Sequence, residues 1–253
     1  MVETLKEKLE KNKLTIGSWI TIGHPTVAEL MLQAPFEWLV VDLEHSAITL
    51  DAAQVLISTI EGGGRTPLVR VGENNQALIK RVMDLGAHGV IVPMVNSKED
   101  AKRAVDSVKY PPVGKRGVGL YRAQKYGEGF EEYKKWLADE SVVIVQIEHI
   151  DAVKNIEEIL KVKGVDGCII GPYDLSASLG IPGKFDDKRM KNALERVREA
   201  CRRLKKPLGF HVVPPDHKLL QQKIDEGYTF LAFSLDFMFL GAKCREELAK
   251  VKR

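Results

Sequence analysis

The chain has 253 residues, of which 44% are hydrophobic and 29% are charged, and its formal net charge is +3. This composition suits a globular protein with a sizeable core, and it excludes the collagen-like, disordered and disulfide-scaffold classes. The small positive excess is interspersed along the chain and predicts no nucleic-acid partner.

The N-terminal segment and the cysteines indicate where the protein works. Residues 1–13 form an alternating-charge helix pattern without the apolar region of a signal peptide. No apolar stretch approaches the ~20 residues that span a bilayer, so we expect no membrane partner. The three cysteines are an odd number without a CxxC pair, which indicates neither a disulfide framework nor a zinc site. We therefore expect a cytoplasmic protein.

Short β-branched runs alternate with amphipathic stretches from one end of the chain to the other. The predicted strands cover 14–21, 37–43, 66–71, 88–94, 142–148, 166–171, 207–213 and 229–234. The predicted helices between them cover 50–64, 75–87, 97–108, 151–162, 188–204 and 215–227. In the first of these helices, apolar side chains recur with helical spacing at Ala53, Leu56, Ile57 and Ile60.

Eight strands in strict alternation with helices predict an α/β fold built from eight βα units. Nearly continuous apolar strands fit a parallel sheet that helices cover on its outer face. A single closed (β/α)8 TIM barrel over residues 1–253 is the first choice, and an open doubly wound sheet is the alternative. No linker divides the chain. A long loop and a helix at about 109–140 interrupt the pattern, and loops of this length are usually functional.

Polar side chains gather where the predicted strands end, which is where barrels of this kind carry their active sites. In chain order these residues are Asp42, Glu44, His45, Arg70, Pro93, Met94, Gln146, Glu148, Gly171, Pro172, Tyr173, Asp174, His211, Ser234 and Asp236. Cys168 lies within a strand and is expected to be a small core residue.

Glu148 and Asp174 each follow a buried run directly, where an ionised acid needs a partner. A hard divalent cation would serve both, and a solvated or structural role is the alternative. Arg70 would either pair with one of these acids or neutralise an oxyanion. His45 would act as a general base if a carboxylate orients it, or would be structural. Asp42 and Asp84 are the candidate partners of His45, although Asp84 comes late in a helix.

Six motifs at matching spacing resemble the metal-dependent (class II) pyruvate aldolases, which include 4-hydroxy-2-oxoheptanedioate aldolase and 2-dehydro-3-deoxyglucarate aldolase. The likeness covers nearly the whole chain. Its motifs are DLEHS (42–46), PLVRV (67–71), RVMDLGAHGVIVPMV (81–95), KYPPVGKRGVG (109–119), QIE (146–148) and GPYDLSASLG (171–180).

The resemblance implies reversible retro-aldol cleavage of a 4-hydroxy-2-oxo acid to pyruvate and an aldehyde. It implies a Mg²⁺, Mn²⁺ or Co²⁺ ion and a homo-oligomer, a hexamer or trimer, whose subunits exchange the last helix. The roles that it carries over are metal binding by Glu148 and Asp174, catalysis by His45, Arg70 and Asp84, and pyruvate binding by Gln146 and the turn of Gly171, Tyr173 and Asp174.

The sequence departs from the family at several places near the expected site. Tyr173 replaces a small residue, His149 and Ile150 follow the metal-binding glutamate, and the segment 120–127 differs from the usual one. The sequence therefore leaves the aldehyde open. A related lyase acting on a coenzyme A thioester and a non-catalytic barrel that binds metal or keto acids are the alternatives. A Schiff-base aldolase would need a lysine at a strand end, and none of the predicted strands offers one.

Overall fold

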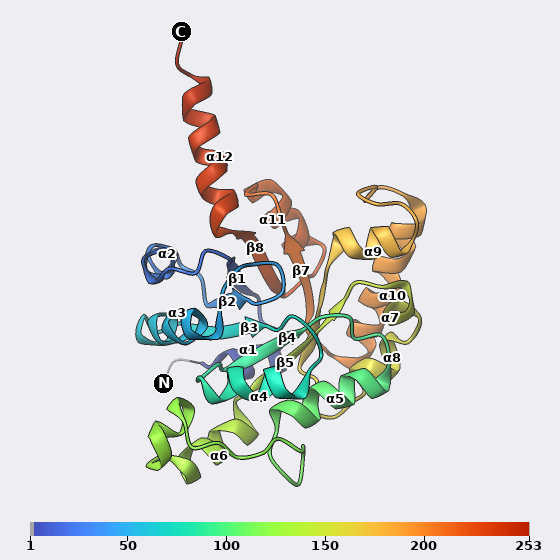
Figure 1. Ribbon diagram of the computed structural model, residues 1–253. Coiled ribbons are helices and arrows are strands. Elements are labelled where there is room, and N and C mark those ends of the chain that lie inside the picture. Colours follow the sequence, from blue (N-terminus) through green and yellow to red (C-terminus); the bar gives the residue numbers. More distant parts are fainter. Residues whose placement is uncertain (1–2, 253) are drawn as a thin grey trace.

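The computed structural model describes residues 3–252 and contains a closed barrel of eight parallel strands in chain order, with β8 pairing β1 (Figure 1). The strands are β1 (Thr15–Ile20), β2 (Trp38–Asp42), β3 (Thr66–Arg70), β4 (Gly89–Val92), β5 (Val142–Ile147), β6 (Gly167–Ile170), β7 (Leu208–Val212) and β8 (Phe230–Leu235). All eight predicted strands and the predicted TIM barrel are confirmed, and the open sheet is wrong.

Helices cover most of the outer face of the barrel, while α1 closes one end of it and α12 projects away. They are α1 (Leu5–Glu10), α2 (Pro25–Leu32), α3 (Leu50–Gly62), α4 (Gln76–Asp84), α5 (Lys98–Val108), α6 (Phe130–Asp139), α7 (Ile150–Lys154), α8 (Ile156–Leu160), α9 (Pro172–Ser178), α10 (Lys188–Leu204), α11 (His217–Asp225) and α12 (Asp236–Ala249), with a 3-10 segment, η1 (Arg122–Gly127). None of the described helices combines the length and hydropathy needed to cross a membrane.

The barrel interior is a packed core and not a channel. Its side chains include Trp38, Phe230 and Ile144, and the rings of Trp38 and Phe230 stack at 4.2 Å. Gly17 makes room for this stack, because a Cβ at that position would lie 2.0 Å from the Trp38 ring. Helix α1 adds two leucines to the same cluster and so closes one end of the barrel. A second, larger cluster fills the space between the strands and the outer helices.

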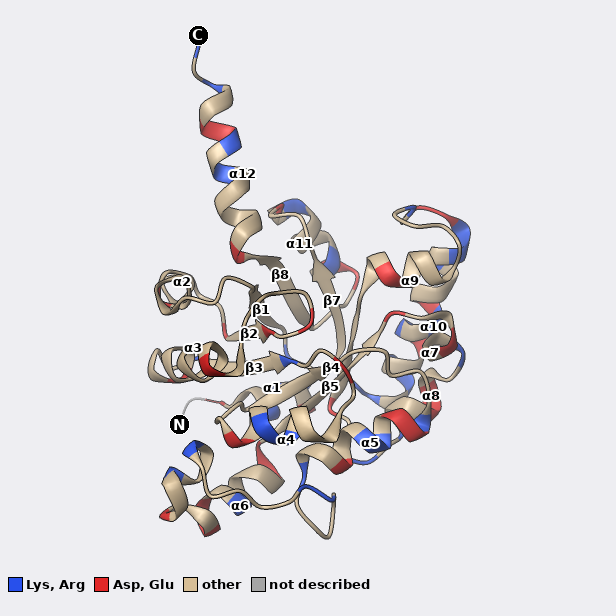
Figure 2. Ribbon diagram, in the orientation of Figure 1, with Lys and Arg blue, Asp and Glu red and all other residues tan. Residues whose placement is uncertain are grey.

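One predicted helix, 151–162, is divided into α7 and α8 at Asn155. The Asn155 side chain donates to the backbone oxygen of Asn96 at 2.9 Å, and its backbone leaves the helical region. The interruption thus comes from a contact between segments far apart in the sequence. The strands carry few charges, whereas Lys and Arg alternate with Asp and Glu along the outer helices (Figure 2).

The segment between β4 and β5 contains the expected long loop and helix, seen as η1 and α6. Lys109 is buried at its start and donates to the backbone oxygens of Leu137, Ala138 and Ser141, at 2.7, 3.1 and 3.2 Å. These carbonyls lie at the C-terminal end of α6, where a cation complements the helix dipole. Lys109 therefore fixes the helix to the barrel wall.

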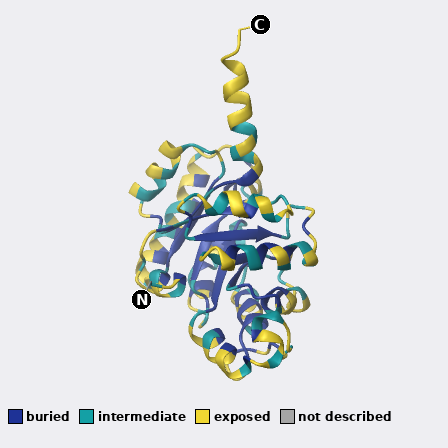
Figure 3. Ribbon diagram, turned by 90° about the vertical axis from the view of Figure 1, so that its left-hand side faces the viewer, coloured by how far each residue is buried: buried dark blue, intermediate teal, exposed yellow. Residues whose placement is uncertain are grey.

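Helix α12 leaves the barrel directly after β8 and projects away from it (Figures 1 and 3). Its first turns contact the body through Phe239, whose ring packs against Phe36 and Phe233. Beyond that point the helix is exposed, including Leu240 and Leu248 at 62% and 61%. Exposed apolar side chains of this kind commonly mark an interaction site, so we expect the outer part of α12 to contact a partner.

Candidate active site

Asp42 and Arg70 form the fixed part of the site at the ends of β2 and β3. The two residues are paired in the sheet register, and the guanidinium donates to both carboxylate oxygens, from Nε at 2.9 Å and from Nη2 at 2.7 Å. Burial alone would raise the pKa of Asp42, but Arg70 and two backbone N–H groups outweigh burial and lower it. The guanidinium also lies 4.4 Å from the centre of the Trp19 ring.

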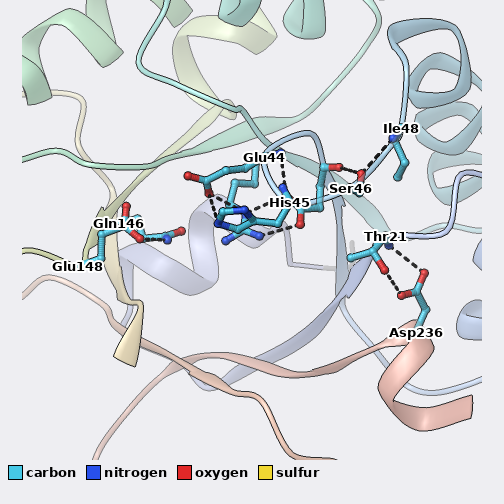
Figure 4. A network of polar contacts seen from close by, with 10 residues as sticks. Thr21, Glu44, His45, Ser46, Ile48, Gln146, Glu148 and Asp236 are labelled. Carbon is cyan, nitrogen blue, oxygen red and sulfur yellow. Dashed lines mark hydrogen bonds and ion pairs between the residues drawn. The ribbon is translucent and has the colours of Figure 1, made fainter. Parts of the chain in front are cut away.

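A tight turn after β2 presents Glu44 and His45. Asp42 Oδ1 accepts from the backbone N–H groups of Glu44 and His45 at 3.0 and 3.4 Å, and the Ser46 hydroxyl donates to the Asp42 carbonyl. Figure 4 shows Glu44, His45 and Ser46 on this loop, with Gln146 and Glu148 on one side and Asp236 on the other. The apolar strand therefore ends in a hydrogen-bonded turn that positions the side chains of Glu44 and His45.

His45 and Glu44 differ in their exposure. The His45 side chain is 66% exposed, and its Nε2 lies 3.8 Å from Glu44 Oε2. Glu44 is mostly buried, and its Oε2 lies 3.2 Å from Arg70 Nε without accepting a hydrogen bond. Burial raises the pKa of Glu44 to about 7 against the attraction of Arg70, and the neighbouring carboxylates Glu148, Asp42 and Asp174 add to the rise. The sequence named Glu44 but gave it no role.

Glu148 lies just beyond β5 and is buried. Its Oε1 accepts from the Met94 backbone N–H at 2.7 Å, and its Oε2 accepts from the Gln146 amide. Burial raises the pKa of Glu148, these two hydrogen bonds lower it, and the charge of Asp174 raises it further. Gly171 gives the carboxylate its room, because a Cβ there would lie 3.1 Å from Glu148 Oε2.

These groups suit a hard divalent cation. Glu148 and Asp174 repel each other, and the buried Oε1 of Gln146 accepts no hydrogen bond from the described residues. A Mg²⁺-type ion is commonly held by one or two carboxylates and completes its shell with water and substrate. Residues 3–252 contain no cluster of three or more His, Cys, Asp and Glu side chains in a metal-binding arrangement. A cation here would therefore depend on two protein carboxylates.

A cavity of about 230 Å³ lies among the side chains at the C-terminal ends of the strands. Eight of the residues predicted at strand ends line it: His45, Arg70, Gln146, Gly171, Pro172, Tyr173, Asp174 and His211. Glu148 lies against it through Gln146 and Gly171. The sequence did not predict its aromatic and apolar walls, which are Trp19, Ile169, Ile170, Val213, Leu235, Phe237 and Met238.

Asp84 lies apart from this cavity. It ends α4, and its carboxylate accepts from Arg116, a fully buried side chain whose guanidinium also donates to Tyr133 Oη at 3.0 Å. Within residues 3–252, no hydrogen bond or ion pair joins Asp84 to His45. A single chain thus brings together every predicted site residue except Asp84.

Three residues that the sequence left without a role have structural partners. Asp236 accepts from the backbone N–H groups of Thr21 and Ile22, both at 2.8 Å, which ties the end of β1 to the start of α12. His149 Nδ1 caps α7 by accepting from the Asp151 backbone N–H at 3.2 Å. His211 packs against Trp19, and burial lowers its pKa to about 3, so its imidazole is neutral.

A larger cavity, of about 810 Å³, lies between η1, α6 and the barrel. It contains none of the predicted site residues. Its charged groups are largely paired with one another, as in Arg122 with Glu61 and Lys125 with Glu132. The smaller cavity is therefore the candidate active site, because it lies at the C-terminal ends of the strands and is lined by His45, Arg70 and Asp174.

Comparison with known proteins identifies the family of the chain. Residues 15–241 match the HpcH/HpaI aldolase/citrate lyase family. The chain is 34% identical to the 2-keto-3-deoxy-L-rhamnonate aldolase of Escherichia coli (strain K12) over 249 residues, which cover 98% of this chain and 92% of the relative.

Two crystal structures have the same fold over almost their full length. An HpcH/HpaI aldolase from Desulfitobacterium hafniense DCB-2 has a TM-score of 0.89 at 31% sequence identity, with 99% of this chain and 98% of that chain covered. An HpcH/HpaI aldolase/citrate lyase family protein from Burkholderia cenocepacia J2315 has a TM-score of 0.93 at 29% identity, with both chains fully covered at 100%.

Proposed function

This chain belongs to the HpcH/HpaI aldolase/citrate lyase family and is a carbon–carbon lyase, and from this premise we propose that it cleaves a 4-hydroxy-2-oxo acid reversibly to pyruvate and an aldehyde with a divalent cation. One observation carries the proposal: a single cavity contains Arg70, His45 and Asp174, with buried Glu148 beside it. Cleavage next to a ketone passes through an enolate, and this arrangement offers positive charge and a base in one place.

The cation would be Mg²⁺, Mn²⁺ or Co²⁺, held by Glu148 and Asp174. When bound, it supplies Lewis-acid stabilisation of the keto oxygen on which the enolate charge develops. The two hydrogen bonds to Glu148, from Met94 N–H and the Gln146 amide, fix the carboxylate before the ion arrives. Such supporting contacts commonly affect metal affinity about 10–100-fold.

Arg70 would stabilise the enolate oxygen from a fixed position. Its fork is already occupied on one edge by Asp42, and the Trp19 ring covers one face of the guanidinium. The arginine therefore loses little freedom when substrate binds, which is the condition for efficient electrostatic catalysis.

His45 would move the proton to and from the hydroxyl that becomes the aldehyde oxygen. Its imidazole lines the cavity and is solvent accessible, so it can exchange protons with water. Glu44 Oε2, at 3.8 Å, is its nearest carboxylate within the chain. The role of Asp84 as the partner that raises the basicity of His45 stays a prediction from the resemblance, and the proposed function does not depend on it.

The segment from Gly171 to Asp174 would bind the pyruvate carboxylate. It begins α9, whose first backbone N–H groups have no partner within the helix. Gln146 lines the same cavity and would contact pyruvate through its amide. The aldehyde portion would then meet Tyr173, Phe237 and Met238. We propose 2-dehydro-3-deoxyglucarate, 4-hydroxy-2-oxoheptanedioate and 2-keto-3-deoxy-L-rhamnonate as the first substrates to test.

Exchange of the pyruvate methyl hydrogens in D₂O, followed by NMR, tests the proposal without the unknown aldehyde. After treatment with a chelator, added Mn²⁺ or Mg²⁺ should restore exchange, and Arg70→Ala should reduce it about 10²–10³-fold. Arg65→Ala is a matched control, because Arg65 directly precedes β3 and lies at the end of that strand opposite the candidate active site. If no metal supports either exchange or cleavage of the three candidate acids, the proposed function is wrong.

A lyase acting on a coenzyme A thioester is the second candidate, because the matched family includes citrate lyases. The two reactions share an enolate and a cation site, so the cavity residues fit both. Incubation with citryl- and malyl-type CoA esters separates them: release of acetyl-CoA without turnover of any 4-hydroxy-2-oxo acid would favour this alternative.

We also propose that the enzyme is a homo-oligomer, a hexamer or trimer, in which α12 is exchanged between subunits. Three observations support this arrangement: α12 projects from the barrel, its leucines are exposed, and Ile16 and Phe233 on β1 and β8 are only partly covered. A helix from a second copy would cover these strands as the missing outer helix.

A further inference from the structure

Two of the three cysteines meet in the core between β6 and α10, and neither of them lines the candidate active site. Cys168 lies in β6 and Cys201 in the last turn of α10, and their sulfur atoms are 3.5 Å apart. Both side chains are buried, at 0% and 2% exposure, whereas Cys244 on α12 is exposed. The sequence gave no sign of this pair, because the two cysteines are 33 positions apart and belong to different elements.

A third cavity leads to this pair from outside. It measures about 270 Å³, lies at the C-terminal end of α10, and includes Cys201 in its wall. Its other lining residues include the cations Arg198, Arg202, Lys205 and Lys206. Cys168 does not line the cavity, so a small molecule that enters reaches Cys201 first.

From the sulfur contact and this cavity, we propose that Cys168 and Cys201 form a peroxide-responsive disulfide. A hydroperoxide entering the cavity oxidises the Cys201 thiol to a sulfenic acid and leaves as water, when hydrogen peroxide is the oxidant. The Cys168 thiol then attacks the Cys201 sulfur, the S–O bond breaks, and a second water leaves. The balance is two thiols and one peroxide to one disulfide and two waters.

Formation of the disulfide requires only a small movement of the two sulfur atoms. A disulfide needs its sulfurs at about 2.05 Å, so the two atoms must approach by roughly 1.5 Å. Cys201 lies one turn before the end of α10, where the helix stops at Lys205 in the left-handed conformation. Helix ends are the most adaptable parts of helices, so the shift is confined to one terminal turn.

The chemical environment sets the conditions for the reaction. Hydrogen bonding to Cys168 and burial together raise the pKa of Cys201, and the nearby Lys206 partly offsets them. The thiolate is the reactive form, so oxidation is slow at neutral pH and becomes faster as the pH rises. Cys201 is therefore protected from weak oxidants, and we expect its oxidation to require an excess of peroxide at alkaline pH.

The bond would enclose a functional segment. The chain between the two cysteines contains α9, and with it Tyr173 and Asp174 of the candidate active site. Closing a loop of this size restricts the unfolded chain, and we expect a rise in Tm of roughly 5–10 °C.

Intact-mass analysis of the full-length chain with Cys244→Ser tests the inference. The folded protein is treated with hydrogen peroxide at pH 8.5, unfolded, and alkylated with N-ethylmaleimide. We expect a loss of about 2 Da, no alkylation, and a tryptic peptide linking Cys168 to Cys201. Two alkylated thiols after treatment, or addition of oxygen to Cys201 without a link, would overturn the proposal.

A second variant tests the order of the steps. With Cys168→Ala added, the sulfenic acid on Cys201 cannot be resolved, and dimedone should label Cys201 in the folded protein. With Cys201→Ala instead, dimedone should leave Cys168 unlabelled, because Cys168 does not line the cavity. Labelling of Cys168 but not of Cys201 would contradict the route. Neither test depends on catalytic turnover, so their outcome is independent of the proposed function.

Discussion

At the scale of single residues, neighbouring side chains and backbone groups hold Arg70 and Glu148 in place, whereas His45 is exposed. Arg70 is held by Asp42 and Trp19, and Glu148 by Met94 and Gln146. His45, by contrast, is mostly exposed and has only a long contact with Glu44. Fixed charges and one solvent-accessible imidazole are what an enolate-forming site needs, because the charge must be preorganised whereas the proton must be exchanged with water.

His45→Ala should therefore reduce activity without reducing stability. We expect aldol cleavage to fall about 10²–10⁴-fold, as for loss of a general base. The midpoint of unfolding should change little, because substitutions at exposed positions usually alter stability by less than about 0.5 kcal/mol. Steady-state kinetics and thermal unfolding of the same preparation check both parts. His217→Ala, on α11, is the control, and cleavage close to the wild-type rate in His45→Ala would remove His45 from the mechanism.

The raised pKa of Glu44 predicts that the stability of the fold depends on pH. Its pKa in the folded protein is raised from 4.5 to about 7, so the folded state binds a proton that the unfolded state has lost. Its contribution to stability is complete below about pH 4.5 and is lost as pH rises through 7. The loss amounts to at most about 3 kcal/mol.

Glu44→Gln should remove this loss, because the amide does not ionise. In the presence of chelator, the variant should exceed the wild type in Tm at pH 8 by more than it does at pH 5, with Glu29→Gln as the exposed control. Added Mg²⁺ should narrow the difference, since a cation near Glu148 and Asp174 offsets their charges. An equal difference at both pH values would show that the Glu44 carboxyl is ionised at pH 5.

At the scale of elements, β-branched runs were sufficient to predict all eight strands, because a buried parallel strand has both faces apolar. The break of the helix at Asn155 could not be predicted, since its partner is the backbone of Asn96. Helix α9 was interpreted only as a turn. Its seven residues are too few for a clear apolar period, and Pro172 at its first position resembles a turn residue as much as a helix start.

The site was predictable to the extent that it lies at strand ends. Chain order alone predicted that His45, Arg70, Gln146 and Asp174 would lie on one rim, because parallel strands end on the same side. The burial of Glu44, the cover over Arg70 and the apolar wall were not predictable. Those properties come from contacts among side chains of several elements, including β1, β3, β6, β8 and α12, which a strand pattern does not specify.

Gly171, between β6 and α9, provides an element-scale prediction. A methyl group there would press on Glu148 Oε2 at 3.1 Å and on Gln146 Nε2 at 3.3 Å. We expect Gly171→Ala to weaken Mn²⁺ affinity about 10–100-fold by displacing the carboxylate. Isothermal titration measures this directly. Gly62→Ala, in α3, is the matched control because a Cβ there has open space, and equal affinities in the two variants would refute the proposed support of the cation site.

At the scale of the whole molecule, the barrel is closed by its strands but its helical layer is incomplete. Each of the strands β1 to β7 is followed by a helix that packs on the barrel. Helix α12, which follows β8, projects away from it (Figure 3). The partly covered Ile16 and Phe233 lie on the strands that α12 would otherwise protect. Exchange between subunits would complete the layer without any change in the fold of one chain.

This arrangement predicts that one substitution far from the site controls assembly. Leu240 is 62% exposed in the single chain, and in an exchanged helix it would be buried against the next subunit. Leu240→Glu should then dissociate the oligomer, because an unpaired buried charge costs several kcal/mol. Leu240→Met should keep it intact. Light scattering coupled to size-exclusion chromatography decides the matter: a glutamate variant of unchanged mass, or a monomeric wild-type protein, would show that α12 serves another purpose.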